Sequence, residues 1–230
     1  MADGLGDPEV DRLRALDTCV VSDALDALGL PGVIDDITPR WEGARAAGRA
    51  VTMQLAEGSA PEGRAKVHLG VRAIQSAAPG DVIVVANAGR LGMGSWGGLL
   101  SVAAQQRGLA GVVTDGACRD VDEARELRFP VFARGSAART ARGRVHEQSC
   151  NEPVRIGSLT VRSGDLVLAD GTAVVVIFAE QAAVVLDQAE QIAARESAMA
   201  EEIRDGAELP KVLGIRYEDM LAEATGGTGV

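Results

Sequence analysis

Hydrophobic positions recur at two spacings along the chain, and these spacings divide it into a helical start, an alternating centre and a β-rich second half. Leucine, valine and alanine at helical spacing predict one amphipathic helix over residues 9–28, which ends at Gly29. Short apolar runs then alternate with helical stretches. The expected elements are strand 48–55, helix 66–78, strand 81–86, helix 98–107, strand 110–114, helix 120–128 and strand 130–133.

The pattern changes after residue 150 to short apolar runs separated by Gly, Ser and Asp turns. These runs predict strands over 153–157, 159–161, 165–169 and 173–178, followed by a long amphipathic helix over 182–204. The tail from about residue 224 is expected to be loose. Because neither a repeat nor a linker divides the sequence, we expect one α/β domain over residues 1–230 with a C-terminal helix.

Composition and charge exclude several classes of function. A hydrophobic content of 47% with 24% charged residues predicts a sizeable core, and a net charge of −10 without a basic block argues against nucleic-acid binding. No stretch approaches the roughly 20 apolar residues that span a membrane. Three unpaired cysteines without a signal-peptide pattern predict a cytoplasmic protein. The two histidines have no companions at zinc-ligand spacing, which argues against a histidine zinc site.

The segment from Gly97 to Asp120 carries the most chemistry, because it joins a glycine turn, a helix start, a buried strand and an Arg-Asp pair. A helix start presents free backbone N–H groups that attract anions. Arg119 is a bidentate cation for a carboxylate, and Asp120 is a hard oxygen ligand for Mg²⁺ or Mn²⁺. This combination is suited to holding a small oxo-acid against a divalent cation.

Two other interpretations compete with that hypothesis. Asp120 followed by Glu123 is typical of a helix cap, with Glu123 then a solvated helix residue. The glycines of 92–97 match G-x-G-x-x-G, with Asp115 near the end of the next strand, as in dinucleotide-binding motifs. However, the preceding strand ends near Asn87, four residues before the first glycine, whereas that motif turns at once. This favours a smaller ligand.

The stretch GGLLSVAAQQRGLAGVVTDGACRD resembles the core signature of the RraA-like superfamily, and further segments agree in order. These segments are Val21–Leu25, Pro79–Val85, Phe129–Gly135 and Gly164–Asp170. The superfamily includes class II 4-hydroxy-4-methyl-2-oxoglutarate / 4-carboxy-4-hydroxy-2-oxoadipate aldolases and the regulator of ribonuclease activity A. The resemblance implies a compact layered α-β-β sandwich of the swivelling β/β/α type. It also implies a homotrimer or homohexamer with active sites at subunit interfaces.

The same resemblance implies a lyase that uses Mg²⁺ or Mn²⁺ to cleave a 4-hydroxy-2-oxo diacid and release pyruvate, with oxaloacetate decarboxylation as a further activity. By motif position, the backbone N–H groups of Leu99 and Leu100 bind pyruvate together with Arg119, and Asp120 holds the metal. The implied substrate-binding set is Gly97, Gly98, Leu99, Leu100 and Arg119. Glu196 is the candidate acid that a neighbouring subunit donates, and its alternative is a solvated helix carboxylate.

The sequence departs from the aldolase pattern at one position. Those aldolases carry an acidic residue twenty-one positions before the arginine, where this chain has Gly98. We therefore expect Gly98→Asp to raise aldolase turnover. Two alternatives remain open, namely a non-enzymatic regulatory or binding protein and an enzyme of the same fold that acts on a different oxo-acid. Asp120 favours the metal-dependent enzyme, because the regulator branch lacks an aspartate after the arginine.

Overall fold

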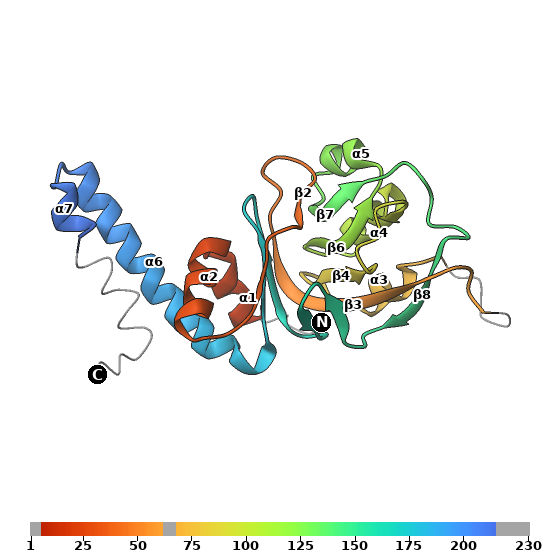
Figure 1. Cartoon of the computed structure of the whole chain (residues 1–230), viewed down its shortest axis with the longest axis horizontal. Helices are drawn as coiled ribbons and strands as arrows, with labels where there is room; N and C mark the ends of the chain where they lie inside the picture. Colours follow the sequence, from red (N-terminus) through yellow and green to blue (C-terminus); the bar gives the residue numbers. More distant parts are fainter. Residues whose placement is uncertain (1–5, 62–67, 215–230) are drawn as a thin grey trace.

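A large mixed sheet forms the centre of the molecule (Figure 1). The computed structural model describes residues 6–61 and 68–214. Strands follow one another across the sheet in the order β1-β12-β11-β3-β4-β6-β7-β2, while β5 pairs with β6 and β8 with β3. Its strands are β1 Val33–Ile34, β2 Thr38–Pro39, β3 Ala46–Glu57, β4 Val82–Ala86, β5 Gly94–Trp96, β6 Gly111–Cys118, β7 Val131–Ser136, β8 Val145–Cys150, β11 Leu166–Ala169 and β12 Val174–Ile177.

Helices cover the sheet, and a separate hairpin of β9 (Val154–Ile156) and β10 (Leu159–Val161) completes the fold. The α-helices are α1 Pro8–Arg14, α2 Thr18–Ala27, α3 Val71–Ser76, α4 Gly98–Gln106, α5 Val121–Glu126, α6 Ala182–Arg204 and α7 Leu209–Val212. A short 3₁₀ turn, Ala179–Gln181, leads into α6. This mixed α/β fold with a C-terminal helix confirms the predicted fold class.

The buried side chains form three layers. One apolar cluster joins α3, α4 and α5 to one face of the parallel strands β3, β4, β6 and β7. A second cluster packs the β9–β10 hairpin on the opposite face. A third joins α1, α2 and the first half of α6 to β11 and β12. Strand β3 connects these layers, because its twelve residues pair in turn with β11, β4 and β8.

The N-terminal helical region contains two helices instead of the one predicted over residues 9–28, so that expectation was wrong. The chain leaves the helix after Arg14, and the side chain of Asp17 accepts a hydrogen bond from the N–H of Val20 at 2.9 Å. Asp17 thus begins a second helix as its N-cap, a role that aspartate fills well. The helical spacing of the apolar residues continues through this break, so the spacing alone does not reveal it.

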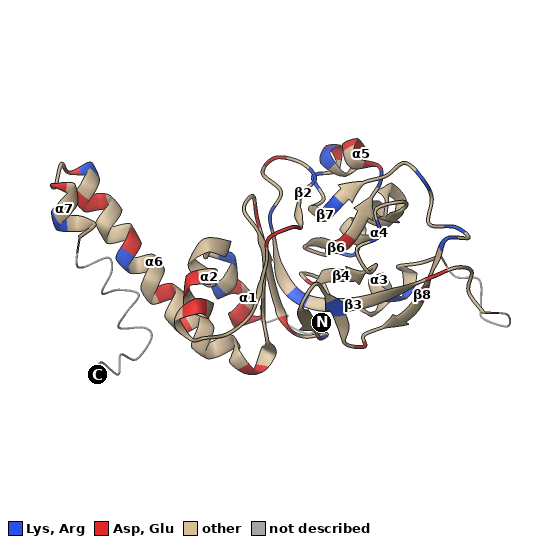
Figure 2. Ribbon diagram, in the orientation of Figure 1, with Lys and Arg blue, Asp and Glu red and all other residues tan. Residues whose placement is uncertain are grey.

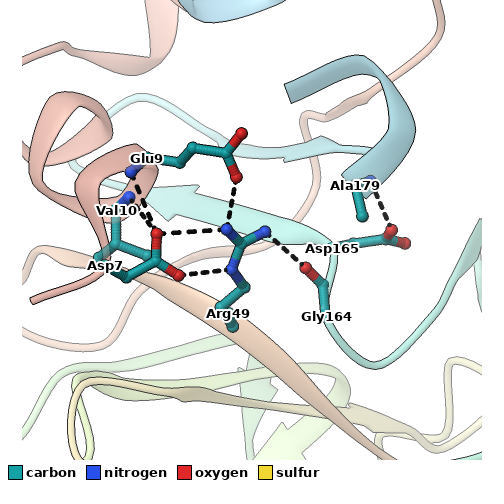
Figure 3. A network of polar contacts seen from close by, with 7 residues as sticks. All are labelled: Asp7, Glu9, Val10, Arg49, Gly164, Asp165 and Ala179. Carbon is teal, nitrogen blue, oxygen red and sulfur yellow. Dashed lines mark hydrogen bonds and ion pairs between the residues drawn. The ribbon is translucent and has the colours of Figure 1, made fainter. Parts of the chain in front are cut away.

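Arg49 of β3 ties α1 to the sheet (Figure 3). Its guanidinium pairs with Asp7 at 2.7 Å and also with Glu9, and it donates to the carbonyl oxygen of Gly164 at 3.0 Å. The hydrogen bond from Arg49 lowers the pKa of Asp7. Because Gly164 lies just before β11, this network fixes α1 across two neighbouring strands.

The second half of α6 extends beyond the helices that cover its first half (Figure 1). Its buried side chains end at Ile192, although the helix continues to Arg204 and carries α7 at its far end. Within the described residues, no helix is long and apolar enough to cross a bilayer. The predicted loose tail from residue 224, and the first two residues of the predicted helix 66–78, lie outside the described residues.

Candidate functional site

The start of α4 supplies the backbone donors of the candidate site. Gly97 precedes the helix in an extended conformation and its first turn has no side-chain cap of its own. The N–H of Gly98 donates to Oδ2 of Asp120 at 2.9 Å. The N–H groups of Leu99 and Leu100 follow in the same turn, where helix geometry leaves them without intrahelical partners. The side chain of Leu100 is buried, whereas that of Leu99 is 83% exposed at the surface of the site.

Arg119 and Asp120 reach this helix start from the end of β6. The N–H of Arg119 donates to the carbonyl oxygen of Trp96 at 2.9 Å, which fixes the backbone beside β5. Nε of Arg119 lies 3.2 Å from Oδ2 and 3.3 Å from Oδ1 of Asp120. Arg119, Asp120 and the start of α4, which the sequence predicted to act together, therefore lie next to one another in the structure.

Asp120 has an unusual backbone, with φ +59° and ψ +44°. Left-handed conformations are uncommon outside glycine, although aspartate tolerates them better than most residues. Asp120 precedes α5, but its side chain makes no capping hydrogen bond to that helix and bonds to α4 instead. The helix-cap interpretation of Asp120 was thus wrong for α5. The turn aims the carboxylate at the neighbouring helix, where it meets Arg119.

A cavity of about 540 Å³ opens beside this corner. It is lined by Arg119, Asp120, Val121, Asp122, Glu123, Ser136, Ala137 and Ala138. Three of these residues are acidic and one is basic. Asp122 is paired with Arg125 at 2.7 Å, and its side chain is 83% exposed, so its negative charge is compensated by Arg125 and by solvent. Asp120 and Glu123 are the two carboxylates nearest to the start of α4, because both approach Gly98.

Glu123 occupies the space that a side chain at position 98 would fill. A Cβ built on Gly98 would lie 1.8 Å from Oε2 and 2.4 Å from Cδ of Glu123. Glu123 of α5 thus places its carboxylate beside position 98, where the aldolase pattern has an acidic residue. An aspartate at 98 would meet only the far end of the Glu123 side chain, which is exposed and can turn aside at little cost, so the expectation that Gly98→Asp raises turnover stays a prediction.

Two carboxylates at one corner suit a particular kind of cation. In the parts of the chain that the structure describes, no three histidine, cysteine, aspartate or glutamate residues gather as a metal cage. Zinc prefers such closed sets of nitrogen and sulfur ligands. Mg²⁺ and related hard cations bind through one or two carboxylates and keep several waters. Asp120 with Glu123 fits this second class.

The dinucleotide interpretation of the glycine run does not fit. Asp115 is buried, and its carboxylate accepts hydrogen bonds from the N–H groups of Asn87 and Gly89, the latter at 3.1 Å. Burial raises the pKa of Asp115. Its oxygens are therefore used inside the protein to hold the loop that follows β4. In addition, β5 occupies Gly94–Trp96, so the glycines do not form a simple strand-turn-helix cradle.

Glu196 lies on α6, on the other side of the molecule from α4 and α5 (Figure 1). Burial, followed by repulsion from Asp23 and Asp17 of the α2 region, raises the pKa of Glu196. Figure 2 shows acidic positions along both α2 and α6. Within one chain Glu196 is thus not joined to Arg119 and Asp120, and its delivery to a neighbouring subunit stays a prediction.

Comparison with known proteins identifies the family that the sequence motifs resemble. A family model described as RraA-like, Aldolase/RraA, matches residues 18–176. The chain is similar to a protein from Halalkalibacterium halodurans named "Putative 4-hydroxy-4-methyl-2-oxoglutarate aldolase". The two are 33% identical over 197 residues, and this alignment covers 85% of this chain and 89% of that protein.

Solved structures extend the likeness to the fold. An uncharacterized protein from Pseudomonas syringae pv. tomato is similar with a TM-score of 0.81 and 31% identity, over 89% of this chain and 96% of that one. Streptomyces coelicolor RraAS2, described as an unusual member of the RNase ES inhibitor RraA protein family, has a TM-score of 0.73 and 25% identity. The match covers 88% of this chain and 98% of that one.

Proposed function

The chain belongs to the RraA-like (Aldolase/RraA) family, and on this premise we propose that it is a divalent-metal-dependent pyruvate aldolase. Its substrate is a 4-hydroxy-2-oxo diacid, which it cleaves to release pyruvate, and it also decarboxylates oxaloacetate. One observation carries the proposal: Arg119, Asp120 and the start of α4 meet at one corner of a cavity.

The corner offers donors to the carboxylate and ketone oxygens of the pyruvate moiety. The N–H groups of Leu99 and Leu100 point out of the first turn of α4, where the helix dipole favours a negative charge. Arg119 presents a planar fork that matches a carboxylate with two parallel hydrogen bonds. These donors fix the three-carbon acid beside the carboxylate of Asp120.

Both reactions develop negative charge on the ketone oxygen. In aldol cleavage the 4-hydroxyl proton passes to water, the C3–C4 bond breaks so that C4 becomes the carbonyl carbon of a second oxo-acid, and the electron pair of the bond forms the enolate of pyruvate. In decarboxylation carbon dioxide departs and the same enolate remains, and a proton then returns to C3. Arg119 holds a fixed positive charge where this negative charge develops, an arrangement that stabilises the transition state.

Asp120, with Glu123 beside it, would hold Mg²⁺ or Mn²⁺. When bound, such a cation supplies Lewis-acid stabilisation of the ketone oxygen. The short link from Asp120 to the N–H of Gly98 keeps its carboxylate at the start of α4, next to the donors that bind the substrate. One charged corner thus serves both the acid and the cation.

The exposed side chain of Leu99 at this corner supports a further part of the proposal, a homotrimer or homohexamer in which a neighbour covers the site. In that assembly Glu196 of one subunit serves the site of another. Light scattering coupled to gel filtration gives the mass of the assembly, and a monomer at assay concentration would contradict this part alone.

The function is tested by measuring pyruvate with lactate dehydrogenase and NADH. Purified protein with Mg²⁺ or Mn²⁺ is offered oxaloacetate and 4-hydroxy-4-methyl-2-oxoglutarate, and EDTA is expected to stop turnover. Reactions with metal but no protein give the uncatalysed decarboxylation of oxaloacetate, which must be subtracted. If no substrate of this class yields pyruvate above that background, the proposed function is wrong.

Glu123 provides a prediction specific to this chain. Glu123→Ala is expected to lower kcat/KM by roughly 10–100-fold, the usual cost of losing a group that supports a metal site. Gly98→Asp alone is expected to raise activity, because the far end of Glu123 can turn aside at little cost and the corner then gains a further carboxylate. Gly98→Asp combined with Glu123→Ala is expected to recover activity, because the new carboxylate enters the vacated space.

Glu126→Ala is the matched control for this exchange, since Glu126 is an exposed acid on the same helix and does not line the cavity. It is expected to leave kcat/KM unchanged. Wild-type activity in Glu123→Ala, or no recovery when Gly98→Asp is added to it, would contradict the assignment of Glu123.

A further inference from the structure

The side chain of Arg119 lies flat against two glycines. A Cβ built on Gly94 would be 2.9 Å from Cγ of Arg119 and 3.1 Å from both its Cβ and Cδ. A Cβ on Gly97 would be 2.9 Å from Cγ and 3.3 Å from Cδ of the same side chain. Contacts below about 3.4 Å between carbon atoms are repulsive, because the optimum lies near 3.5–4.0 Å. The aliphatic part of Arg119 therefore fills a slot that exists only because both residues lack a side chain.

The backbone on each side of this slot is held in place. Gly94 pairs with Ala117 of β6, and its N–H donates to the carbonyl oxygen of Arg139 at 2.9 Å. Two residues later Trp96 is buried, and its indole nitrogen donates to Ser101 at 3.0 Å. Strand β5 is thus fixed to the sheet and to α4. The strand therefore has little freedom to move away from Arg119 when position 94 carries a larger residue.

Space, and not backbone conformation, is what requires glycine at position 94. Gly94 is not among the glycines with positive φ, so alanine can adopt its backbone geometry. The atoms that a methyl group would meet are Cβ, Cγ and Cδ of Arg119, which are close to the backbone. A long side chain can bend its far end aside at little cost, but a contact at Cγ requires another χ1 rotamer, and one at Cβ requires a small shift of the backbone. The guanidinium then leaves its place beside Asp120.

We propose that Gly94 is a positioning residue that sets the guanidinium of Arg119 for substrate binding, an inference that rests on the proposed function. The three atoms nearest to a Cβ at position 94 all belong to the side chain of Arg119. Gly97 differs, because a Cβ there would also lie 2.9 Å from Oδ2 of Asp120. A methyl group at 94 therefore meets Arg119 first, whereas one at 97 also meets the carboxylate of the metal ligand directly.

The test compares Gly94→Ala, Gly97→Ala and Gly92→Ala. A displacement of a catalytic group by about 1 Å costs on the order of 100-fold, so kcat/KM for oxaloacetate is expected to fall about 100-fold in Gly94→Ala. Mn²⁺ affinity, measured by electron paramagnetic resonance without substrate, is expected to be at least as tight as in the wild type in Gly94→Ala, because the Arg119 guanidinium no longer competes for Asp120, and to weaken in Gly97→Ala. Gly92→Ala is the control, because a Cβ there meets nothing within 4 Å.

A crystal structure of Gly94→Ala gives a readout that does not depend on turnover. The inference expects Arg119 in a different rotamer with its guanidinium moved away from Asp120. An unmoved guanidinium, or wild-type kinetics in Gly94→Ala beside an active wild type, overturns the inference alone. An inactive wild type overturns the proposed function, and the position of Arg119 in the crystal then still decides whether Gly94 sets it. Thermal unfolding of all three variants shows whether any loss reflects misfolding.

Discussion

Asp120→Asn is expected to reduce metal-dependent pyruvate release by about a thousandfold in kcat/KM, or about 4 kcal/mol of transition-state stabilisation. Asparagine has nearly the same shape, and its amide oxygen still accepts the hydrogen bond from the N–H of Gly98 that Asp120 receives at 2.9 Å. The folded structure is therefore preserved while the negative charge is removed. The measurement is steady-state kinetics across a Mn²⁺ titration, together with thermal unfolding.

Asp122→Asn is the matched control, because Asp122 lines the same cavity but is exposed and paired with Arg125. It is expected to keep nearly all activity and metal affinity. Equal kinetics in Asp120→Asn and the wild type would mean that Asp120 holds no cation. A loss of folded protein in Asp120→Asn would instead assign it a structural role between β6 and α4.

Arg119→Lys is expected to lower kcat/KM by roughly 100- to 1000-fold, the loss seen when one preorganised donor to a developing oxyanion is removed. Lysine keeps the positive charge but not the planar pair of donors, so it cannot bind the carboxylate of the substrate in the same way. Because Asp120 is untouched, Mn²⁺ binding is expected to persist. The measurement is KM and kcat with oxaloacetate, with Mn²⁺ affinity determined separately.

Arg125→Lys provides the control for this substitution, since Arg125 is exposed on α5 and pairs only with Asp122 among the residues the structure describes. Its kinetics are expected to match the wild type. Retention of full activity by Arg119→Lys would show that a bare charge is sufficient. The two-pronged recognition of the oxo-acid would then be wrong.

Local sequence patterns predicted the elements that are long or strongly apolar. Strand β4 and helix α6 follow directly from their runs of valine, isoleucine, leucine and alanine, whereas β6 was predicted only up to Thr114 and continues to Cys118. Strand β5 was missed because its three residues, Gly94–Trp96, carry turn signals, and β8 because its side chains are mostly polar. Both strands are stabilised by pairing with distant partners, β6 and β3, and local spacing does not encode such pairing.

The candidate site was predictable where its residues are neighbours in sequence. Arg119 and Asp120 adjoin each other, and the glycine run before α4 marks the helix start that they meet. Glu123 is exposed, as predicted for a solvated helix residue, but its approach to Gly98 is not predictable because it depends on how α5 packs against α4. The sequence signal that could have placed Glu123 at the site is its position about one helical turn after Asp120. Glu196 depends on an assembly, which a single chain does not contain.

The most direct test of the central claim is anomalous diffraction from a crystal of this protein grown with Mn²⁺ and soaked with pyruvate. The account predicts a manganese peak beside the carboxylate of Asp120, with the carboxylate of pyruvate against Arg119 and the N–H groups of Leu99 and Leu100. A manganese peak elsewhere, or pyruvate bound away from α4 while Asp120 contacts only protein, would contradict it.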